Sequence, residues 1–115
     1  MGYRSEVALA LAQDAAKLFK ALCDHNSDLN QLIEDSDHTE AWSKEEIEQG
    51  YTTKFHWTYI KWYDGYLEID QIQEFMNNID EHEWHFLRIG EDTEDIDQQG
   101  AFWESDMYIT RAISL

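Results

Sequence analysis

An α+β fold, with a single sheet of about four strands and two main helices on one face, is what this sequence predicts. Hydrophobic residues make up 43% of the chain and aromatic residues 14%, enough to bury a core. Apolar residues alternate in some stretches, as in strands, and recur at helical spacing in others. These stretches follow in the order strand, helix, acidic insertion, strand, helix, strand, strand, for which a ferredoxin-like topology or a permuted relative is the natural candidate. A length of 115 residues predicts one domain, spanning residues 1–115.

The N-terminal part supplies the first strand and the first helix. Residues 6–11 are largely apolar, with Val7, Leu9 and Leu11 alternating, which favours a buried strand. Between residues 14 and 23 the apolar positions recur at the i, i+3, i+4 and i+7 spacing of one helix face. Cys23, the one cysteine of the chain, lies on that face. We therefore expect it to be a buried small hydrophobe, and a single cysteine fits a reducing cytoplasm.

An acidic insertion follows over residues 28–49. It holds eight Asp and Glu residues and a single lysine, and its apolar pattern is thin. The apolar positions at 29–33 either extend the first helix or begin another. We expect a loop at 35–39 and a short helix after Ser43, because Ser43 and Glu46 have the spacing of a capping box.

The second half of the chain returns to strand and helix patterns. Aromatic and β-branched residues predict a strand over 55–63, ended by the turn at Asp64 and Gly65. Apolar residues at helical spacing from Leu67 to Met76 predict the second helix, which ends near Asn77 and Asn78. Alternation predicts a third strand over 84–89, which stops at Gly90.

The last part of the chain is predicted as a loop and a strand. Residues 91–100 are polar and predict the loop. The fourth strand is expected to begin at Phe102 or Met107 and to end at Ile113. The last two strands would then form an antiparallel hairpin across the loop.

Charge is the most informative feature for function. Twenty-five Asp and Glu against eight Lys and Arg give a net charge of -17. Such a surface repels nucleic acids and membranes and attracts basic proteins or cations. The sequence has neither an apolar run long enough for a membrane span nor an opening typical of a secretory signal. We expect a cytoplasmic protein whose partner is a basic, nucleic-acid-binding protein, with no direct contact to nucleic acid or membrane.

Motifs for catalysis and cofactor binding are missing from the sequence. We find no phosphate-binding glycine loop, no nucleophile elbow and no Cys-x-x-Cys pair, so we expect no enzyme, cofactor or metal site. One stretch, residues 95–106, has Asp at positions one and three, Gly at six and an acid at twelve, as in an EF-hand loop. Gln at position five, Trp at nine and strand-like flanks favour a solvated acidic loop instead. A calcium-binding domain remains an alternative.

Four local strings carry a resemblance to a group of known proteins. They are residues 2–8 (GYRSEVA), 61–63 (KWY), 86–92 (FLRIGED) and 110–113 (TRAI). In this order they resemble small uncharacterised proteins of tailed phages, a similarity that skips the acidic insertion. The resemblance implies a phage origin and a small accessory role. In composition alone, the chain is similar to phage anti-defence proteins, including anti-CRISPR proteins and anti-restriction proteins that mimic DNA.

These observations favour a non-enzymatic inhibitor of a host defence protein, whose carboxylates stand in for nucleic-acid phosphates. A phage interaction or accessory module, acidic only for solubility, is the alternative. The candidate partner-binding residues are the acidic side chains of two segments: Glu91, Asp92, Glu94, Asp95 and Asp97, and Glu34, Asp35 and Asp37. Candidate aromatic anchors for a partner are Tyr63, Tyr66 and Trp103.

Overall fold

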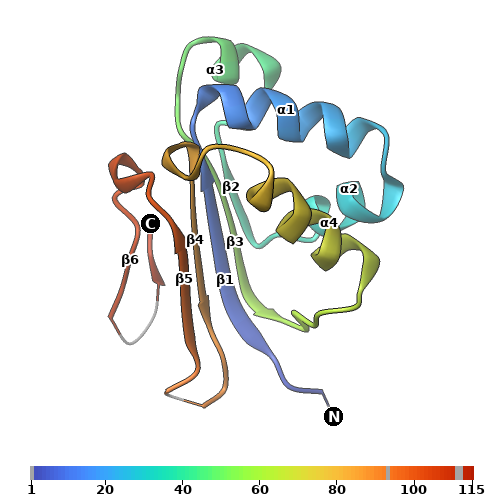
Figure 1. Ribbon diagram of the computed structural model, residues 1–115, viewed down its shortest axis with the longest axis vertical. Coiled ribbons are helices and arrows are strands. Elements are labelled where there is room, and N and C mark those ends of the chain that lie inside the picture. Colours follow the sequence, from blue (N-terminus) through green and yellow to red (C-terminus); the bar gives the residue numbers. More distant parts are fainter. Residues whose placement is uncertain (1, 93, 111–112) are drawn as a thin grey trace.

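The computed structural model describes residues 2–92, 94–110 and 113–115 of the chain (Figure 1). Helices and strands alternate along these residues in an α+β arrangement. In chain order the elements are β1 (Ser5–Leu11), α1 (Gln13–Asp24), α2 (Ser27–Glu34), β2 (His38–Glu40), α3 (Lys44–Glu48), β3 (Thr53–Ile60), α4 (Leu67–Asn77), the 3-10 helix η1 (Glu81–Glu83), β4 (Trp84–Ile89), β5 (Ile96–Gly100), the 3-10 helix η2 (Trp103–Ser105), β6 (Tyr108–Ile109) and β7 (Ile113–Ser114).

The main sheet has five strands in the order β2-β3-β1-β4-β5, and each neighbouring pair is antiparallel. The central strand is β1, which places Val7 opposite Trp57 on β3 and opposite Arg88 on β4. Since β3 and β4 are both antiparallel to β1, they run parallel to each other, and α4 connects them across β1. The prediction of four strands was one strand short.

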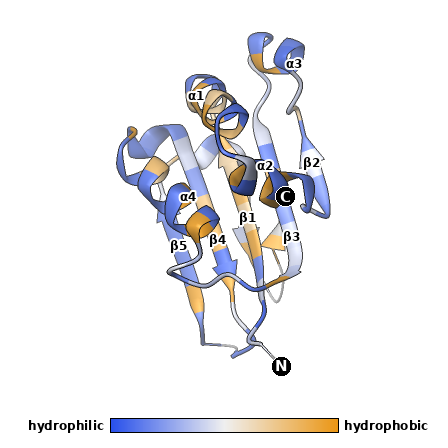
Figure 2. Cartoon of the chain, turned by 90° about the vertical axis from the view of Figure 1, so that its right-hand side faces the viewer, coloured by the Kyte–Doolittle hydropathy of each residue, from blue (hydrophilic) through white to orange (hydrophobic). Residues whose placement is uncertain are grey.

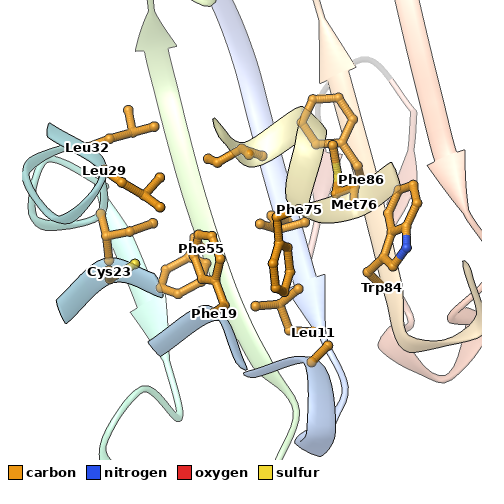
Figure 3. Close-up of a cluster of buried hydrophobic side chains, with 14 of the residues drawn as sticks. Leu11, Phe19, Cys23, Leu29, Leu32, Phe55, Phe75, Met76, Trp84 and Phe86 are labelled. Carbon is orange, nitrogen blue, oxygen red and sulfur yellow. The ribbon is translucent and has the colours of Figure 1, made fainter. Parts of the chain in front are cut away.

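Helices α1, α2, α3 and α4 contribute to a core on one face of this sheet, as predicted for the two main helices (Figure 1). The core forms because alternate residues of β1 (Val7, Leu9 and Leu11) point at the apolar stripes of the helices. Figure 3 shows Phe19 and Cys23 of α1 against Phe55 of β3, and Phe75 of α4 beside them. Figure 2 shows β1 mainly hydrophobic, whereas the edge strand β2 is hydrophilic.

Cys23 is buried as predicted, with 3% of its surface exposed. Burial raises the pKa of its thiol to about 12. A neutral, enclosed thiol is a packing residue, because the thiolate is the reactive form.

The other face of the sheet is covered by the C-terminal segment. Phe102, Met107 and Ile113 pack there against Ala8 and Ala10 of β1. The prediction of a fourth sheet strand ending at Ile113 is therefore wrong. Residues after Gly100 form η2 and the small separate sheet of β6 and β7, while residues 111–112 lie outside the described residues. Phe102, Met107 and Ile113 have the apolar pattern of a strand in the sequence, but in the structure they cover the second face of β1.

The predicted loop at 91–100 is a turn followed by a strand. Residues 96–100 form β5, an edge strand paired with β4, so that Arg88 lies opposite Asp97. The expected antiparallel pair with β4 exists, but its partner is β5. The polar sequence of β5 suits a sheet edge, where polar and charged side chains face water.

The acidic insertion is more regular than predicted. Its apolar positions form a separate helix, α2, and the expected loop at 35–39 runs into the edge strand β2. Ser43 does cap α3 as predicted: its hydroxyl oxygen accepts a hydrogen bond from Glu46 N at 3.2 Å. The predicted strand over 55–63 ends earlier in the structure, where β3 stops at Ile60.

Candidate functional site

The acidic turn, defined as residues 90–92 and 94–95 between β4 and β5, is built around an ion pair. Arg88, the residue before the last of β4, donates from Nη2 to Asp95 Oδ1 at 2.7 Å and from Nη1 to Asp95 Oδ2 at 3.1 Å. Tyr3 Oη donates to the same Oδ2 at 2.7 Å. The Arg88 guanidinium, and then the Tyr3 hydroxyl, lower the pKa of the Asp95 carboxyl. Asp95 is thus a structural anion that fixes the turn.

Gly90 makes this geometry possible. A Cβ added at Gly90 would collide with Asp95 Oδ2 and with Tyr3 Oη. The hydrogen bond between Tyr3 and Asp95 therefore passes directly over the backbone at this position. A residue without a side chain is required here for close approach.

The N-terminal segment holds the rest of the acidic turn. Asp92 N donates to Tyr3 Oη at 3.0 Å, and Arg4 N donates to Glu91 Oε1 at 3.1 Å. The side chains of Glu91, Asp92 and Glu94 nevertheless remain exposed. The backbone that carries these three carboxylates is fixed, while their charges face water.

A cavity of about 340 Å³ lies beside the acidic turn. It opens between the loop before α4, the end of β4 and the start of β5. We call it the aromatic cavity, because Tyr3, Trp62, Tyr63 and Phe86 contribute to its wall. Its remaining lining residues are Asp64, Ile69, Gln73, Arg88, Asp95 and Asp97. It therefore combines aromatic surface with three carboxylates and one guanidinium.

All three residues of the second predicted acidic segment are exposed, but one of them, Asp37, also has a structural role. Asp37 Oδ2 accepts from Thr58 N at 2.7 Å and from Thr58 Oγ1 at 3.0 Å, which ties the start of β2 to β3. The Thr58 backbone N–H, and then its hydroxyl, lower the pKa of the Asp37 carboxyl. Glu34 and Asp35 are exposed at the end of α2, where, among the described residues, they accept from the Asn30 and Gln31 amides.

The two acidic segments lie at different heights along the sheet: the start of β2 is level with Ala8 and Leu87 in the middle of β1 and β4, whereas the acidic turn lies beyond the end of β4 (Figure 1). Strand β2 runs parallel to β1, and β4 runs antiparallel to it. The start of β2 and the end of β4 are therefore directed towards the same edge of the sheet, the one at which β1 begins. These strands are three positions apart in the order of the sheet. Their separation is therefore about 14 Å.

The negative charge of the described surface is hardly neutralised from within. Among the described residues, the pair of Arg88 and Asp95 is the one ion pair between a carboxylate and a Lys or Arg side chain. Lys20 and Lys54 instead donate to main-chain oxygens, of Trp42 and Leu115 respectively. The exposed carboxylates are thus available to an external cation.

The predicted aromatic anchors do not gather in one place. Tyr63 and Tyr66 lie together near the acidic turn, with ring centroids 5.3 Å apart. Trp103 lies on η2, at the other end of β5 (Figure 1), where its ring meets the edge of His85 at 5.2 Å between centroids. Tyr63 lines the aromatic cavity, whereas Trp103 is 65% exposed and stands apart.

The stretch that resembles a calcium loop has a different conformation. Residues 96–100 are extended as β5, and the Asp95 carboxylate is taken up by Arg88. Within the described residues no group of three or more His, Cys, Asp and Glu side chains is placed to hold a metal ion. Nor does any described helix have the length and apolarity needed to cross a membrane.

Sequence reasoning missed Tyr3, Trp62 and Arg88 as parts of this site. Arg88 carried a usable signal, because it follows Trp84 and Phe86 in the alternation of β4 and so shares their core-facing side. A cation in that position requires a carboxylate partner. Tyr3 lies 92 residues from Asp95 along the chain, and no local pattern relates the two.

Comparisons with known proteins identify no relative: no protein-family model, no curated protein and no solved structure matches this chain.

Proposed function

We propose that the protein is a non-enzymatic acidic inhibitor, of phage origin, that binds a basic nucleic-acid-binding protein of the host cell and occupies its nucleic-acid site. The observation that carries the proposal is the unneutralised negative charge of the described surface. A net charge of -17 meets a single described ion pair to Lys or Arg. Such a surface is complementary to a protein that binds phosphates through Arg and Lys.

The arrangement of the exposed carboxylates supports mimicry. Glu91, Asp92 and Glu94 are carried by a turn that Tyr3 and Arg88 hold in place. A segment whose backbone is already held loses less conformational entropy on binding than a mobile one.

We also propose a ferredoxin-like topology for the elements β1-α1-β2-β3-α4-β4, extended by β5 at one edge. The strand order and the parallel pair β3 and β4 around β1 support it. In this arrangement the acidic turn lies at the junction with the added strand, outside the pairing of β1 with β3 and β4. The inhibitor acts in the host cytoplasm and carries out no chemistry of its own.

The test is quantitative capture from a bacterial lysate with two baits. One bait is the parent chain, and the other carries Glu91→Gln, Asp92→Asn and Glu94→Gln. We expect the parent to capture a protein that binds nucleic acid, and the variant to bind the purified partner more than tenfold more weakly, which is about 1.4 kcal/mol. The affinity of the parent should fall steeply with salt, since exposed charges are screened over about 8 Å at physiological ionic strength.

A matched control separates position from total charge. The variant Asp24→Asn, Glu45→Gln and Glu48→Gln removes the same number and kinds of charge from α1 and α3, away from the acidic turn (Figure 1). Its affinity should stay within about twofold of the parent, because the interaction depends on the acidic turn. Equal weakening by both variants would show a non-specific charge effect. Unchanged affinity in the acidic-turn variant would contradict the proposal.

A further inference from the structure

We infer that the aromatic cavity is the anchor site for an arginine side chain of the basic partner. This inference rests on the proposed function and adds to it the residue type that the protein recognises. The cavity volume of about 340 Å³ falls in the range of small-molecule sites, which is about 300–1,000 Å³. It adjoins the acidic turn, because its lining includes Asp95 of the turn and Tyr3, whose hydroxyl donates to Asp95.

The walls of the cavity suit a planar cation. Trp62 is held by the core, since its ring centroid lies 5.3 Å from that of Trp57 and 5.8 Å from that of Phe86. Tyr63 is packed against Tyr66. Aromatic faces fixed in this way attract a cation, and they stack particularly well on a guanidinium.

The charges that line the cavity favour a cation over an anion. Asp64, Asp95 and Asp97 face a single guanidinium, that of Arg88. Asp95 is already engaged by Arg88 on both of its oxygens. Asp64 is exposed and has no hydrogen bond or ion pair to the described residues. An anionic ligand would be repelled, whereas an incoming cation has carboxylates left to pair with.

Asp97 offers the second free oxygen. Its Oδ2 accepts from Gln99 Nε2 at 3.0 Å, while Oδ1 has no partner among the described residues. Gln99 is in turn bound by Gln73 Nε2 at 3.3 Å, so the carboxylate of Asp97 is held in position. A guanidinium presents several N–H donors in one plane and pairs with such carboxylates while stacking on a ring. An ammonium group has neither a planar fork of donors nor a flat face that stacks on a ring, which is why we infer arginine rather than lysine.

The probe is N-acetyl-arginine methylamide, with the corresponding lysine compound for comparison. Titration into ¹⁵N-labelled protein should shift the Trp62 indole signal in a saturable way, and lysine should bind at least fivefold more weakly. The double variant Asp64→Asn and Asp97→Asn should weaken arginine binding at least tenfold. The control variant Asp24→Asn and Glu45→Gln, distant from the cavity, should bind arginine as the parent does. Thermal melts of all the variants confirm that they are folded.

The outcomes distinguish the cavity from the proposed function. If arginine gives no saturable shift up to its solubility limit, or if lysine binds equally well, the arginine site is refuted. If a captured partner binds the Asp64→Asn and Asp97→Asn variant as tightly as the parent but loses affinity for the acidic-turn variant, the arginine site fails and the inhibitor proposal stands. If arginine binds as expected but no partner depends on Glu91, Asp92 and Glu94, the cavity stands and the inhibitor proposal fails.

Discussion

Replacing Asp95 by Asn should destabilise the fold, whereas neutralising its exposed neighbours should not. Asp95 pairs with Arg88 through two contacts and accepts from Tyr3. Its side chain is 35% exposed, so the ion pair is partly screened and we assign it about 1 kcal/mol. The Tyr3 hydrogen bond adds to this stabilisation. Asn keeps one acceptor but turns an N–H towards Arg88, so we expect a loss of about 2 kcal/mol in unfolding free energy.

The variant with Glu91→Gln, Asp92→Asn and Glu94→Gln is the comparison. Its amides keep the acceptor oxygens that Arg4 N and Glu94 N use, and it relieves repulsion between like charges. We expect its stability to lie within about 0.5 kcal/mol of the parent or slightly above it. Urea denaturation followed by circular dichroism measures both variants. Tyr3→Phe serves as an intermediate, with an expected loss smaller than that of Asp95→Asn, because it removes one hydrogen bond and leaves the ion pair in place.

Equal stabilities of the Asp95→Asn variant and the triple variant would refute this reasoning. The ion pair would then be a surface contact without structural effect. A loss of stability in the triple variant would show that Glu91, Asp92 and Glu94 fix the turn themselves.

Three further predictions follow from other parts of the structure. Burial lowers the pKa of His85, and its contacts Ser105 and Trp103 carry no charge. The folded state therefore favours the neutral imidazole. The stability that the neutral ring contributes is fully present above about pH 6.5 and is lost as the pH falls through the lowered pKa. The unfolding free energy of the parent relative to His85→Gln should fall below that pH, and a pH-independent difference would contradict the prediction. Phe19→Ala should cost about 3–5 kcal/mol in urea denaturation, because Phe19 is fully buried among aromatic rings; a cost below 1 kcal/mol would show a loosely packed core. Calorimetry at sub-millimolar calcium should show no saturable site, because residues 96–100 form a strand, and one-to-one binding would overturn that expectation.

Periodic apolar patterns were sufficient to predict much of the fold. Burial against one core gives α1, β1 and α4 their regular apolar spacing. That spacing is visible in the sequence, so these elements could be predicted from it. The strand β5 was not predictable in this way. Its residues 96–100 lie at a sheet edge and are mainly polar, and their place is fixed by pairing with β4 rather than by burial.

The candidate site was predictable only in part. The acidic segments were evident as charge, but their division into structural and exposed carboxylates was not. Asp37 and Asp95 owe their roles to Thr58 and to Arg88 and Tyr3, and two of these three partners are more than 20 residues away in the sequence. Such contacts depend on the register of the sheet. Local composition therefore could not separate anions that hold the fold from anions that face a partner.

Competition with nucleic acid is the most direct test of the central claim. The partner captured by the parent chain is bound to fluorescent duplex DNA, and anisotropy is followed while the parent or the Glu91→Gln, Asp92→Asn and Glu94→Gln variant is added. The account predicts that the parent displaces the DNA in a one-to-one manner and that the variant requires more than ten times the concentration. A ternary complex in which the partner binds DNA and the protein together, or equal displacement by both proteins, would contradict it.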